Sequence, residues 1–408
     1  MASILVTGAS GYIGQFVVDA ALRRGPSVAR VAGTCATAPL HDDDGGDSSS
    51  AWPCPMYRVR LGDGDPSSDT PSTAASTAPT ASTASTASTP STVSTATTAS
   101  FAAVRACLED FRPDVVVHCA AVASLGACEA DPAAAMRANA DPALLAALRE
   151  LCPDCALIFA STDQVFDGLG PLPYGPDARP NPVNAYGRSK AAFECAMGAA
   201  AGDAGNADGA GDAGATDTAD GTGRTGENPA RLLPGKGTIK GTIVRLSNVY
   251  GPRSPFSDPP VGKFVQWLDE QLADDDGSGT SSGGGGGGGE ERDCQVKLFS
   301  DELRCYVHVE DVADLLVALA LKAVEERQEG GDGGGGDGNG DCSDGTSGSN
   351  DGGQGGVGAE CGKTGRPRII HCGGPEALSR VQVGEMVLEA RGYRRKAIKM
   401  VKSRHHER

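Results

Sequence analysis

Short apolar runs alternate with amphipathic segments along most of the chain. Runs rich in Val, Ile and Leu predict buried strands, and apolar residues at helical spacing predict helices. The predicted strands are 3–8, 27–36, 114–121, 156–162 and 241–251. The predicted helices are 14–25, 101–111, 133–152 with a break before Pro142, and 186–197. Repeated strand–helix units with apolar strands predict an α/β fold, a Rossmann-type doubly wound parallel sheet covered by helices on both faces.

Four segments interrupt this alternation: 64–100, 199–236, 276–290 and 328–364. They consist mainly of Ala, Gly, Ser, Thr and Asp and have no hydrophobic periodicity. Such segments bury too little apolar surface to offset the entropy of ordering them. We therefore expect several low-complexity loop insertions in an otherwise ordinary fold.

Composition narrows the class of protein. Hydrophobic residues make up 39% of the 408 residues and Gly reaches 58, as expected for a normal core diluted by the insertions. The net charge of −17 argues against nucleic acid or an anionic membrane as a partner, because phosphates attract clustered Lys and Arg. No apolar run approaches the length that spans a membrane.

Cysteine usage and the start of the chain indicate a cytoplasmic protein. The 13 cysteines are odd in number and scattered through apolar runs, and no secretory segment precedes the first strand. Cys152 and Cys155 are interpreted as part of a helix-to-strand turn, since zinc would need a second pair at matched spacing. His405 and His406 also lack ligand spacing, so no metal is expected.

The stretch "VTGASGYIG" places Gly8, Gly11 and Gly14 after the first strand and at the start of the first helix. Glycines at this spacing allow a tight turn and close approach of a pyrophosphate, and the helix N-terminus favours its negative charge. Glycine is common in tight turns of every kind, but the strand–turn–helix context favours a dinucleotide site.

The end of the second strand bears on which dinucleotide is bound. The stretch "GTCATAPL" (33–40) has neither the acid that commonly holds the ribose of NADH nor an Arg. The absence of this acid favours NADPH over NADH, with Thr34 or Thr37 as hydrogen-bond donors to the additional phosphate of NADPH. Asp63 either reaches the adenine side of the cofactor or is an ordinary turn residue.

A candidate catalytic group follows the strand 156–162. Tyr186 and Lys190 lie four residues apart, on one face of a predicted helix, and Thr162 ends the strand before them. A nearby ammonium is expected to lower the pKa of the tyrosine from roughly 10. Thr162 would donate a hydrogen bond to the oxygen that gains negative charge when a carbonyl is reduced.

These motifs, with "STDQVFDG" (161–168), "RLSNVYGP" (245–252) and "ELRCYVHVEDVADLL" (302–316), resemble the extended short-chain dehydrogenases/reductases. More narrowly, they resemble the dTDP-4-dehydrorhamnose reductase family, which includes the regulatory beta subunit of methionine adenosyltransferase. The resemblance implies a catalytic role for Thr162, Tyr186 and Lys190, with Lys190 also binding the nicotinamide ribose. It implies that Thr162, Asp163 and Asn248 contact substrate. Together, the glycine turn, the open candidate Asp63 and the resemblance give the expected cofactor lining: Gly8, Gly11, Tyr12, Ile13, Gly14, Asp63, Ala120, Ala121, Val122, Tyr186 and Lys190.

The resemblance implies an NAD(P)H-dependent reductase of a 4-keto sugar nucleotide. Dehydratases of this fold carry an acid after the Thr-Asp pair, whereas this chain has Gln164, and an amide cannot act as that base. Gln164 and Asn248 stand where the family often has Tyr and Trp, so the sugar stays open. The alternative is a non-catalytic NADP-binding regulatory subunit. The partner would be a second copy in a homodimer or, under the alternative, a synthetase subunit.

The resemblance also implies a division of the chain. Residues 1–251 are expected to form the NAD(P)-binding Rossmann domain, and 252–395 mainly a smaller C-terminal substrate-binding lobe. The helix 308–325 is expected to return to the Rossmann domain. Residues 396–408 are expected to form a solvated basic tail.

Overall fold

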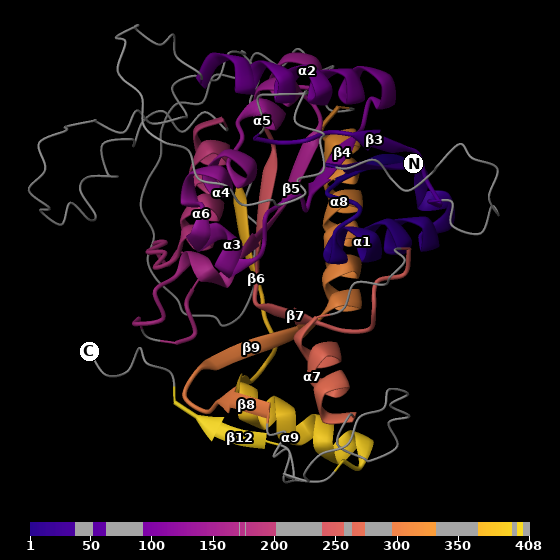
Figure 1. Cartoon of the computed structure of the whole chain (residues 1–408). Coiled ribbons are helices and arrows are strands. Elements are labelled where there is room, and N and C mark those ends of the chain that lie inside the picture. The colour runs from indigo at the N-terminus through magenta and orange to yellow at the C-terminus, as the bar shows by residue number, and fades with distance from the viewer. Residues whose placement is uncertain are drawn as a thin grey trace, which may run out of the picture.

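The computed structural model describes residues 1–36, 52–62, 93–170, 172–175, 177–200, 239–256, 263–273, 296–331, 366–393 and 398–402. They form a larger part around one sheet and a smaller part below it in Figure 1. The strands β7 (Asn248–Tyr250) and β9 (Leu303–His308) lie where the two parts meet.

The central sheet has seven strands in the order β10-β6-β5-β4-β1-β2-β3, and neighbouring strands pair in parallel. Its strands are β1 (Ala2–Thr7), β2 (Val28–Cys35), β3 (Met56–Arg58), β4 (Val115–His118), β5 (Ala156–Thr162), β6 (Gly241–Leu246) and β10 (Arg368–Cys372). Every residue of β1, β4 and β5 is buried, as expected for parallel strands covered on both faces. The order 3-2-1-4-5-6 within this sheet is that of a Rossmann fold, so the predicted fold class is confirmed.

Two helical layers cover the sheet. The helices α1 (Tyr12–Arg23) and α8 (Val309–Gly331) share one hydrophobic cluster with one face of the sheet. On the other face lie α2 (Val93–Phe111), α5 (Ala143–Leu151) and α6 (Ala185–Ala200). The short helices α3 (Leu125–Ala130) and α4 (Pro132–Asn139) contact α6. None of the helices in the described residues is long and apolar enough to cross a membrane.

The smaller part contains two small sheets and two helices (Figure 1). The strand β9 lies between β7 and β11 (Ala377–Ser379), while β8 (Val296–Phe299) pairs in parallel with β12 (Ile398–Val401). The helices α7 (Phe264–Ala273) and α9 (Arg380–Arg391) enclose a separate cluster around Leu268, Leu298 and Leu388. This part therefore has a small core of its own.

Several boundaries differ from the sequence-based expectation. The helix α2 begins at Val93, inside the expected insertion 64–100, and α6 and α8 run a short way into the insertions at 199–236 and 328–364, ending at Ala200 and Gly331. The amphipathic segment 101–111 packs on the sheet, and a packed helix can continue into residues of modest propensity. The rest of these insertions and the segment 276–290 lie outside the described residues.

The expected domain boundaries also differ near the C-terminus. The strand β10 pairs with β6 in the central sheet, although its residues were expected in the lobe. The strand β12 lies within the segment that was expected to be a solvated basic tail. It forms there because Ile398 packs beside α9 and Leu298, while Lys399 stays exposed. The predicted strand 241–251 is two strands, β6 and β7, which join different sheets.

Candidate active site

The glycine turn joins β1 to α1 where β4 ends. Gly8 has a φ of +68°, and a Cβ there would lie 2.5 Å from Cα of Ala120. A Cβ on Gly14 would lie 2.2 Å from the carbonyl oxygen of Gly8. Both positions therefore require glycine, which brings the N-terminus of α1 close to the end of β1.

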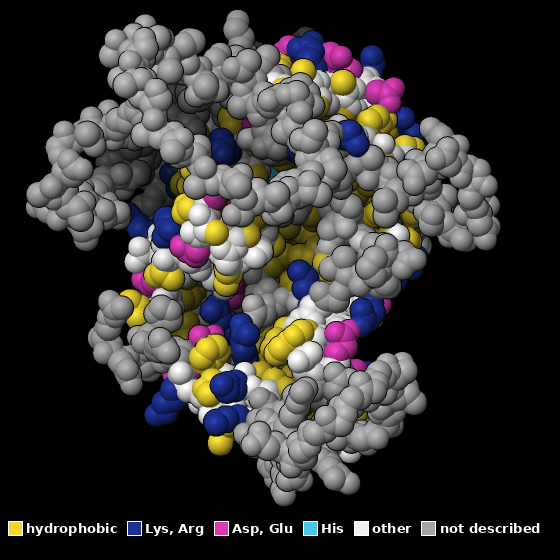
Figure 2. Space-filling view, viewed as in Figure 1, with side chains coloured by type: hydrophobic (Ala, Val, Ile, Leu, Met, Phe, Trp, Pro, Cys, Tyr) yellow, Lys and Arg dark blue, Asp and Glu magenta, His cyan; other side chains and the backbone are white. Residues whose placement is uncertain are grey.

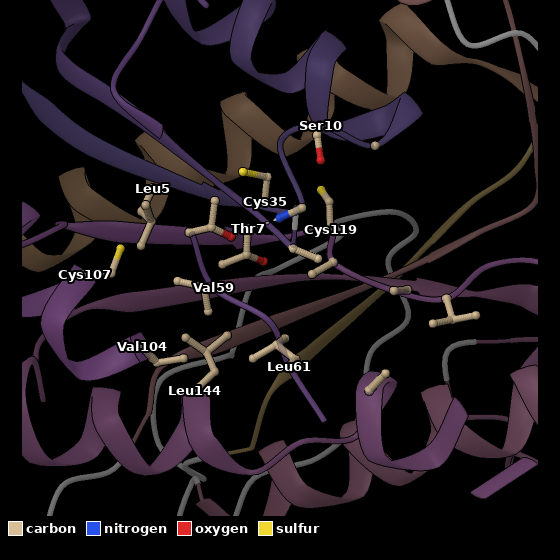
Figure 3. A pocket seen from close by; sticks show the side chains of 18 of the residues that line it. Leu5, Thr7, Ser10, Cys35, Val59, Leu61, Val104, Cys107, Cys119 and Leu144 are labelled. Atoms are coloured by element: carbon tan, nitrogen blue, oxygen red, sulfur yellow. Dashed lines mark hydrogen bonds between the residues drawn. The ribbon is translucent and has the colours of Figure 1, made fainter. Parts of the chain in front are cut away.

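A first cavity of about 250 Å³ opens beside this turn. Its lining includes Gly8, Gly11, Ala120, Ala121 and Val122, five of the residues that the sequence analysis expects to contact a cofactor. Its deeper wall is apolar, with side chains from β1, α2, α5 and the segment after β3, among them Leu5, Val59, Leu61, Val104 and Leu144 (Figure 3). An apolar cavity beside a helix N-terminus suits the adenosine half of a dinucleotide.

Thr34, at the end of β2, is buried and lines the first cavity. Its hydroxyl accepts a hydrogen bond from the backbone N–H of Gly8 at 3.3 Å, so it braces the turn and keeps its own O–H to donate. Thr37 and Asp63 lie outside the described residues. Sequence reasoning missed Arg58, which is exposed and pairs with Cys35 in the β2–β3 register. Its charge acts on the Cys35 thiol, lowering a pKa that burial raises.

A second cavity of about 390 Å³ lies between the central sheet and the smaller part. Figure 2 shows hydrophobic and Lys/Arg side chains on the surface around the hollow between the two parts. The structure brings most of the remaining predicted residues together here, from β5, α6, β7 and α1: Thr162, Asp163, Gln164, Tyr186, Lys190, Asn248, Tyr12, Ile13 and Gly14. Gly11 and Ala121 line both cavities, so the two are adjacent.

Tyr186 and Thr162 interact at the edge of this cavity. Burial and the carboxylate of Asp163 raise the pKa of Tyr186 to about 12, while a side-chain hydrogen bond with Thr162 lowers it. The expectation that Lys190 lowers this pKa is therefore wrong for the structure as described. Burial and Asp163 raise the pKa of Tyr186 more than the Thr162 hydrogen bond lowers it, so the tyrosine is protonated at neutral pH.

Lys190 is a buried amine on the same helix, with 1% of its surface exposed. Its Nζ lies 4.2 Å from the centre of the Phe159 ring, a cation–π contact. Burial lowers the pKa of Lys190 to about 8, and Cys119 and Glu194 act against that shift. Burial and the nearby Lys190 lower the pKa of His118 to about 3, so this imidazole is neutral.

The start of α6 is fixed by Gln164. The side-chain carbonyl of Gln164 accepts a hydrogen bond from Nδ2 of Asn184 at 2.7 Å, and Oδ1 of Asn184 accepts one from the N–H of Gly187 at 2.7 Å. A Cβ on Gly187 would lie 2.1 Å from the backbone oxygen of Gln164. The residue expected near the sugar therefore also holds the helix that carries Tyr186.

The polar residues of the second cavity that sequence reasoning missed include Lys263, Ser247, Tyr306 and Arg380. Nζ of Lys263 lies 5.1 Å from the centre of the Tyr12 ring, and burial lowers the pKa of this lysine. Arg380 opens α9 after a capping box at Ser379, and this S-x-x-Q pattern could have predicted the helix start. Among the described residues, the Ser247 hydroxyl is the buried side-chain group without a hydrogen-bond partner.

Metal ligation has no candidate in the described part of the chain, where no three His, Cys, Asp or Glu side chains are placed to hold an ion. Cys152 and Cys155 are free thiols in the turn between α5 and β5, where the N–H of Cys155 donates to the carbonyl of Cys152. His405 and His406 lie outside the described residues.

The sheet order, the glycine turn and the Tyr-x-x-x-Lys helix define a NAD(P)-binding protein of the extended short-chain dehydrogenase/reductase class. The NAD dependent epimerase/dehydratase family matches residues 4–332. The chain belongs to that family, and the resemblance inferred from its motifs is confirmed.

Curated relatives match over shorter stretches. Methionine adenosyltransferase 2 subunit beta of Danio rerio is 44% identical over 88 residues, which are 22% of this chain and 26% of that protein. The dTDP-4-keto-6-deoxy-D-glucose reductase of Streptomyces niveus is 41% identical over 100 residues, 23% of this chain and 33% of that protein. The matched stretches thus span about a quarter to a third of these relatives.

Solved structures match over nearly the whole chain. UDP-glucose 4-epimerase of Thermus thermophilus, in complex with NAD, gives a TM-score of 0.53 at 21% identity, covering 98% of this chain and 86% of that one. UDP-glucose-4-epimerase of Stenotrophomonas maltophila gives a TM-score of 0.57 at 15% identity, covering 99% and 87%. At these identities the likeness establishes the fold.

Proposed function

We propose that this protein is an NADPH-dependent reductase of a 4-keto sugar nucleotide. The observation that carries the proposal is the meeting of Thr162, a protonated Tyr186 and the buried Lys190 at one cavity that adjoins the glycine turn. Relatives named as dTDP-sugar reductases support the reaction and the substrate class. Gln164 supports reduction over elimination, because an amide cannot remove a proton as a carboxylate does.

The chain's own residues would supply the proton and the orientation. A reduced nicotinamide bound beside the glycine turn supplies the hydride. The Tyr186 hydroxyl donates its proton to the carbonyl oxygen as that oxygen becomes negative, and the raised pKa keeps the donor protonated beforehand. Thr162 donates a hydrogen bond to the same oxygen and orients the carbonyl. The Lys190 ammonium would bind the nicotinamide ribose and, with that ribose in place, stabilise the phenolate left on Tyr186.

The sugar nucleotide would bind on the side of the second cavity that the smaller part lines. Lys263 and Arg380 give their side of the cavity positive charge, which suits a nucleotide diphosphate. Tyr306 and Asn248 are hydrogen-bonded to each other and would contact the sugar. Asp163 would bind a sugar hydroxyl beside Thr162. The substrate site is therefore assembled from β5, β7, β9, α9 and the residue before α7.

The preference for NADPH rests on the end of β2. The stretch 33–40, in which β2 ends, contains no acid, and Arg58 lies opposite Cys35, where an Arg accommodates a 2′-phosphate. Calorimetry with adenosine 2′,5′-bisphosphate and with AMP tests this preference. The bisphosphate should bind more tightly, and Arg58→Ala should remove about 1–3 kcal/mol of that difference. Equal affinity for the two ligands in the unsubstituted protein would overturn the preference.

A screen of keto-sugar nucleotides with both reduced cofactors tests the reaction. Sustained oxidation of NADPH with a dTDP-4-keto-6-deoxy sugar, giving the 4-hydroxy product by mass spectrometry, is the expected result. An unchanged substrate, or an epimer formed without net oxidation of cofactor, would overturn it.

A second candidate function is that of a regulatory subunit, favoured by the similarity to methionine adenosyltransferase 2 subunit beta. Under this alternative the protein binds NADP and turns no sugar over. Co-elution with a methionine adenosyltransferase catalytic subunit, together with a change in that enzyme's rate, would favour it. Turnover of a keto sugar without such binding would favour the reductase.

A further inference from the structure

A buried ion pair begins one helical turn after the candidate catalytic lysine on α6. Nη2 of Arg245 on β6 is 2.7 Å from Oε2 of Glu194 on α6, and the two side chains are 3% and 6% exposed. Nε of Arg245 donates to the same carboxylate at 3.2 and 3.3 Å, and the Ser161 hydroxyl on β5 also donates to it. One carboxylate thus binds two adjacent strands, since Ser161 and Arg245 are partners in the β5–β6 register.

The pair shares the helix face of Lys190. Glu194 follows Lys190 by four residues on α6, one helical turn. Beneath them on β5, Phe159 lies under the Lys190 ammonium and Ser161 under the carboxylate, two residues apart and therefore on one face of the strand. The contacts that fix Glu194 therefore fix the turn of helix that carries Lys190 against the strand that ends in Thr162.

Stability alone does not account for this arrangement. Removing two charges from water costs about as much as their attraction returns, and apolar side chains of similar volume often serve as well. Arg245 also contacts two elements outside α6 and β5: its guanidinium lies 5.0 Å from the centre of the Phe166 ring, and Nη1 is 3.4 Å from Nε2 of His371 on β10. The network thus connects α6 to the segment after β5 and to the strand that the C-terminal segment adds to the sheet.

We propose that Glu194, held by Arg245 and Ser161, is a positioning residue for Lys190. Glu194 keeps the Lys190 ammonium in place beside the bound cofactor and keeps it charged. The inference rests on the proposed function through the role of Lys190 at the nicotinamide ribose. The titratable groups that face Lys190 are His118 on β4, Cys119 directly after that strand, and Tyr186 and Glu194 on α6. His118 is neutral, and burial raises the pKa of Cys119 to about 12, so Glu194 is the carboxylate that supports the ammonium.

The test follows NADPH binding against pH by fluorescence titration. Lys190 is charged below its pKa of about 8 and loses its charge above it. Glu194→Gln removes the supporting charge, so the loss of affinity should begin about 0.5–1 pH unit lower. At pH 8.5 the Kd should rise about 3- to 8-fold, and at pH 6 it should stay within about twofold. Lys190→Ala should abolish the pH dependence.

Two further variants separate positioning from folding. Glu194→Gln leaves Arg245 buried without its carboxylate, so the double variant Glu194→Gln/Arg245→Met is measured beside it, and it should recover the Tm while keeping the shifted pH profile. Asp114→Asn is the matched control: it breaks a half-buried pair with Arg327 away from α6, and should lower the Tm without moving the profile. A double variant with the original pH profile would overturn the proposal. Because binding is the readout, this outcome is distinct from a failure to find a reducible sugar.

Discussion

The two cavities are built in different ways. The first is lined by the glycine turn and by residues at the ends of neighbouring parallel strands, and much of its wall is apolar. The second takes its polar side chains from both parts of the molecule, including Lys263, Tyr306 and Arg380. We call the first cavity, proposed for the cofactor, the cofactor side, and the second, proposed for the substrate, the substrate side. The cofactor side is fixed by backbone geometry, whereas the substrate side depends on single side chains from distant segments. Substitutions should therefore affect the two sides separately.

The largest effect is expected at the boundary between the two sides. Tyr186→Phe removes the proton donor but keeps the ring, so turnover should fall about 10²–10⁴-fold while NADPH affinity stays within about twofold. The measurements are steady-state kinetics and fluorescence titration. Tyr57→Phe is the control, because that hydroxyl donates to Asp110 on α2 and Tyr57 lines neither cavity. Full activity in Tyr186→Phe would exclude it as the donor.

The cofactor side was the more predictable from sequence, for a physical reason. Gly8, Gly11 and Gly14 lie within one short stretch, and the close approaches at Gly11 and Gly14 are to neighbouring residues of the same turn. The parallel sheet follows from apolar strand runs, so its inner strands were also predictable. The helix that carries Tyr186 was predicted because its pattern also lies within one short stretch, 186–197.

The residues of the substrate side could not be predicted from a local sequence pattern. Lys263, Tyr306 and Arg380 come from three separate segments, and no local pattern states that they meet at one cavity. The pKa of Tyr186 depends on burial and on Asp163, which sequence spacing does not reveal. The strand β12 was missed because a few residues in a basic segment carry a weak pattern, and pairing with β8 decides their conformation.

Gly14→Ala should disturb the glycine turn, which borders both cavities. The added Cβ would lie 2.2 Å from the Gly8 oxygen and 2.8 Å from Cα of Ala9, and these backbone atoms cannot move aside without distorting the turn. The free energy of unfolding should fall by about 1–3 kcal/mol, and NADPH affinity about tenfold. Gly198→Ala on α6 is the matched control, because its Cβ meets nothing within 4 Å and should stabilise the helix by about 0.5–1 kcal/mol. Unchanged NADPH binding in Gly14→Ala would contradict the assigned turn.

Arg380→Ala should weaken the substrate side alone. Loss of one half-buried cation facing a diphosphate should raise the KM for the sugar nucleotide about 5- to 30-fold, with NADPH affinity unchanged. Arg391→Ala on the same helix is the control, since that guanidinium pairs with Asp269 at 2.7 Å and does not line the cavity. Equal KM values for the two variants would remove Arg380 from the site.

The smallest effect, and the sharpest test of the difference between the two sides, is expected at Ser247. Its hydroxyl is buried at the second cavity without a partner in the described residues, so it has lost water and gained no hydrogen bond. Ser247→Ala should therefore leave the Tm unchanged or raise the stability by up to about 1 kcal/mol, while the KM for the sugar nucleotide rises about 2- to 10-fold. Ser189→Ala is the matched control, because that buried hydroxyl accepts from Asn139 at 2.9 Å and donates to the Tyr186 carbonyl at 2.8 Å. This control should lose about 1–2 kcal/mol. A comparable loss of stability in Ser247→Ala would show that the hydroxyl serves the fold and is not kept for substrate.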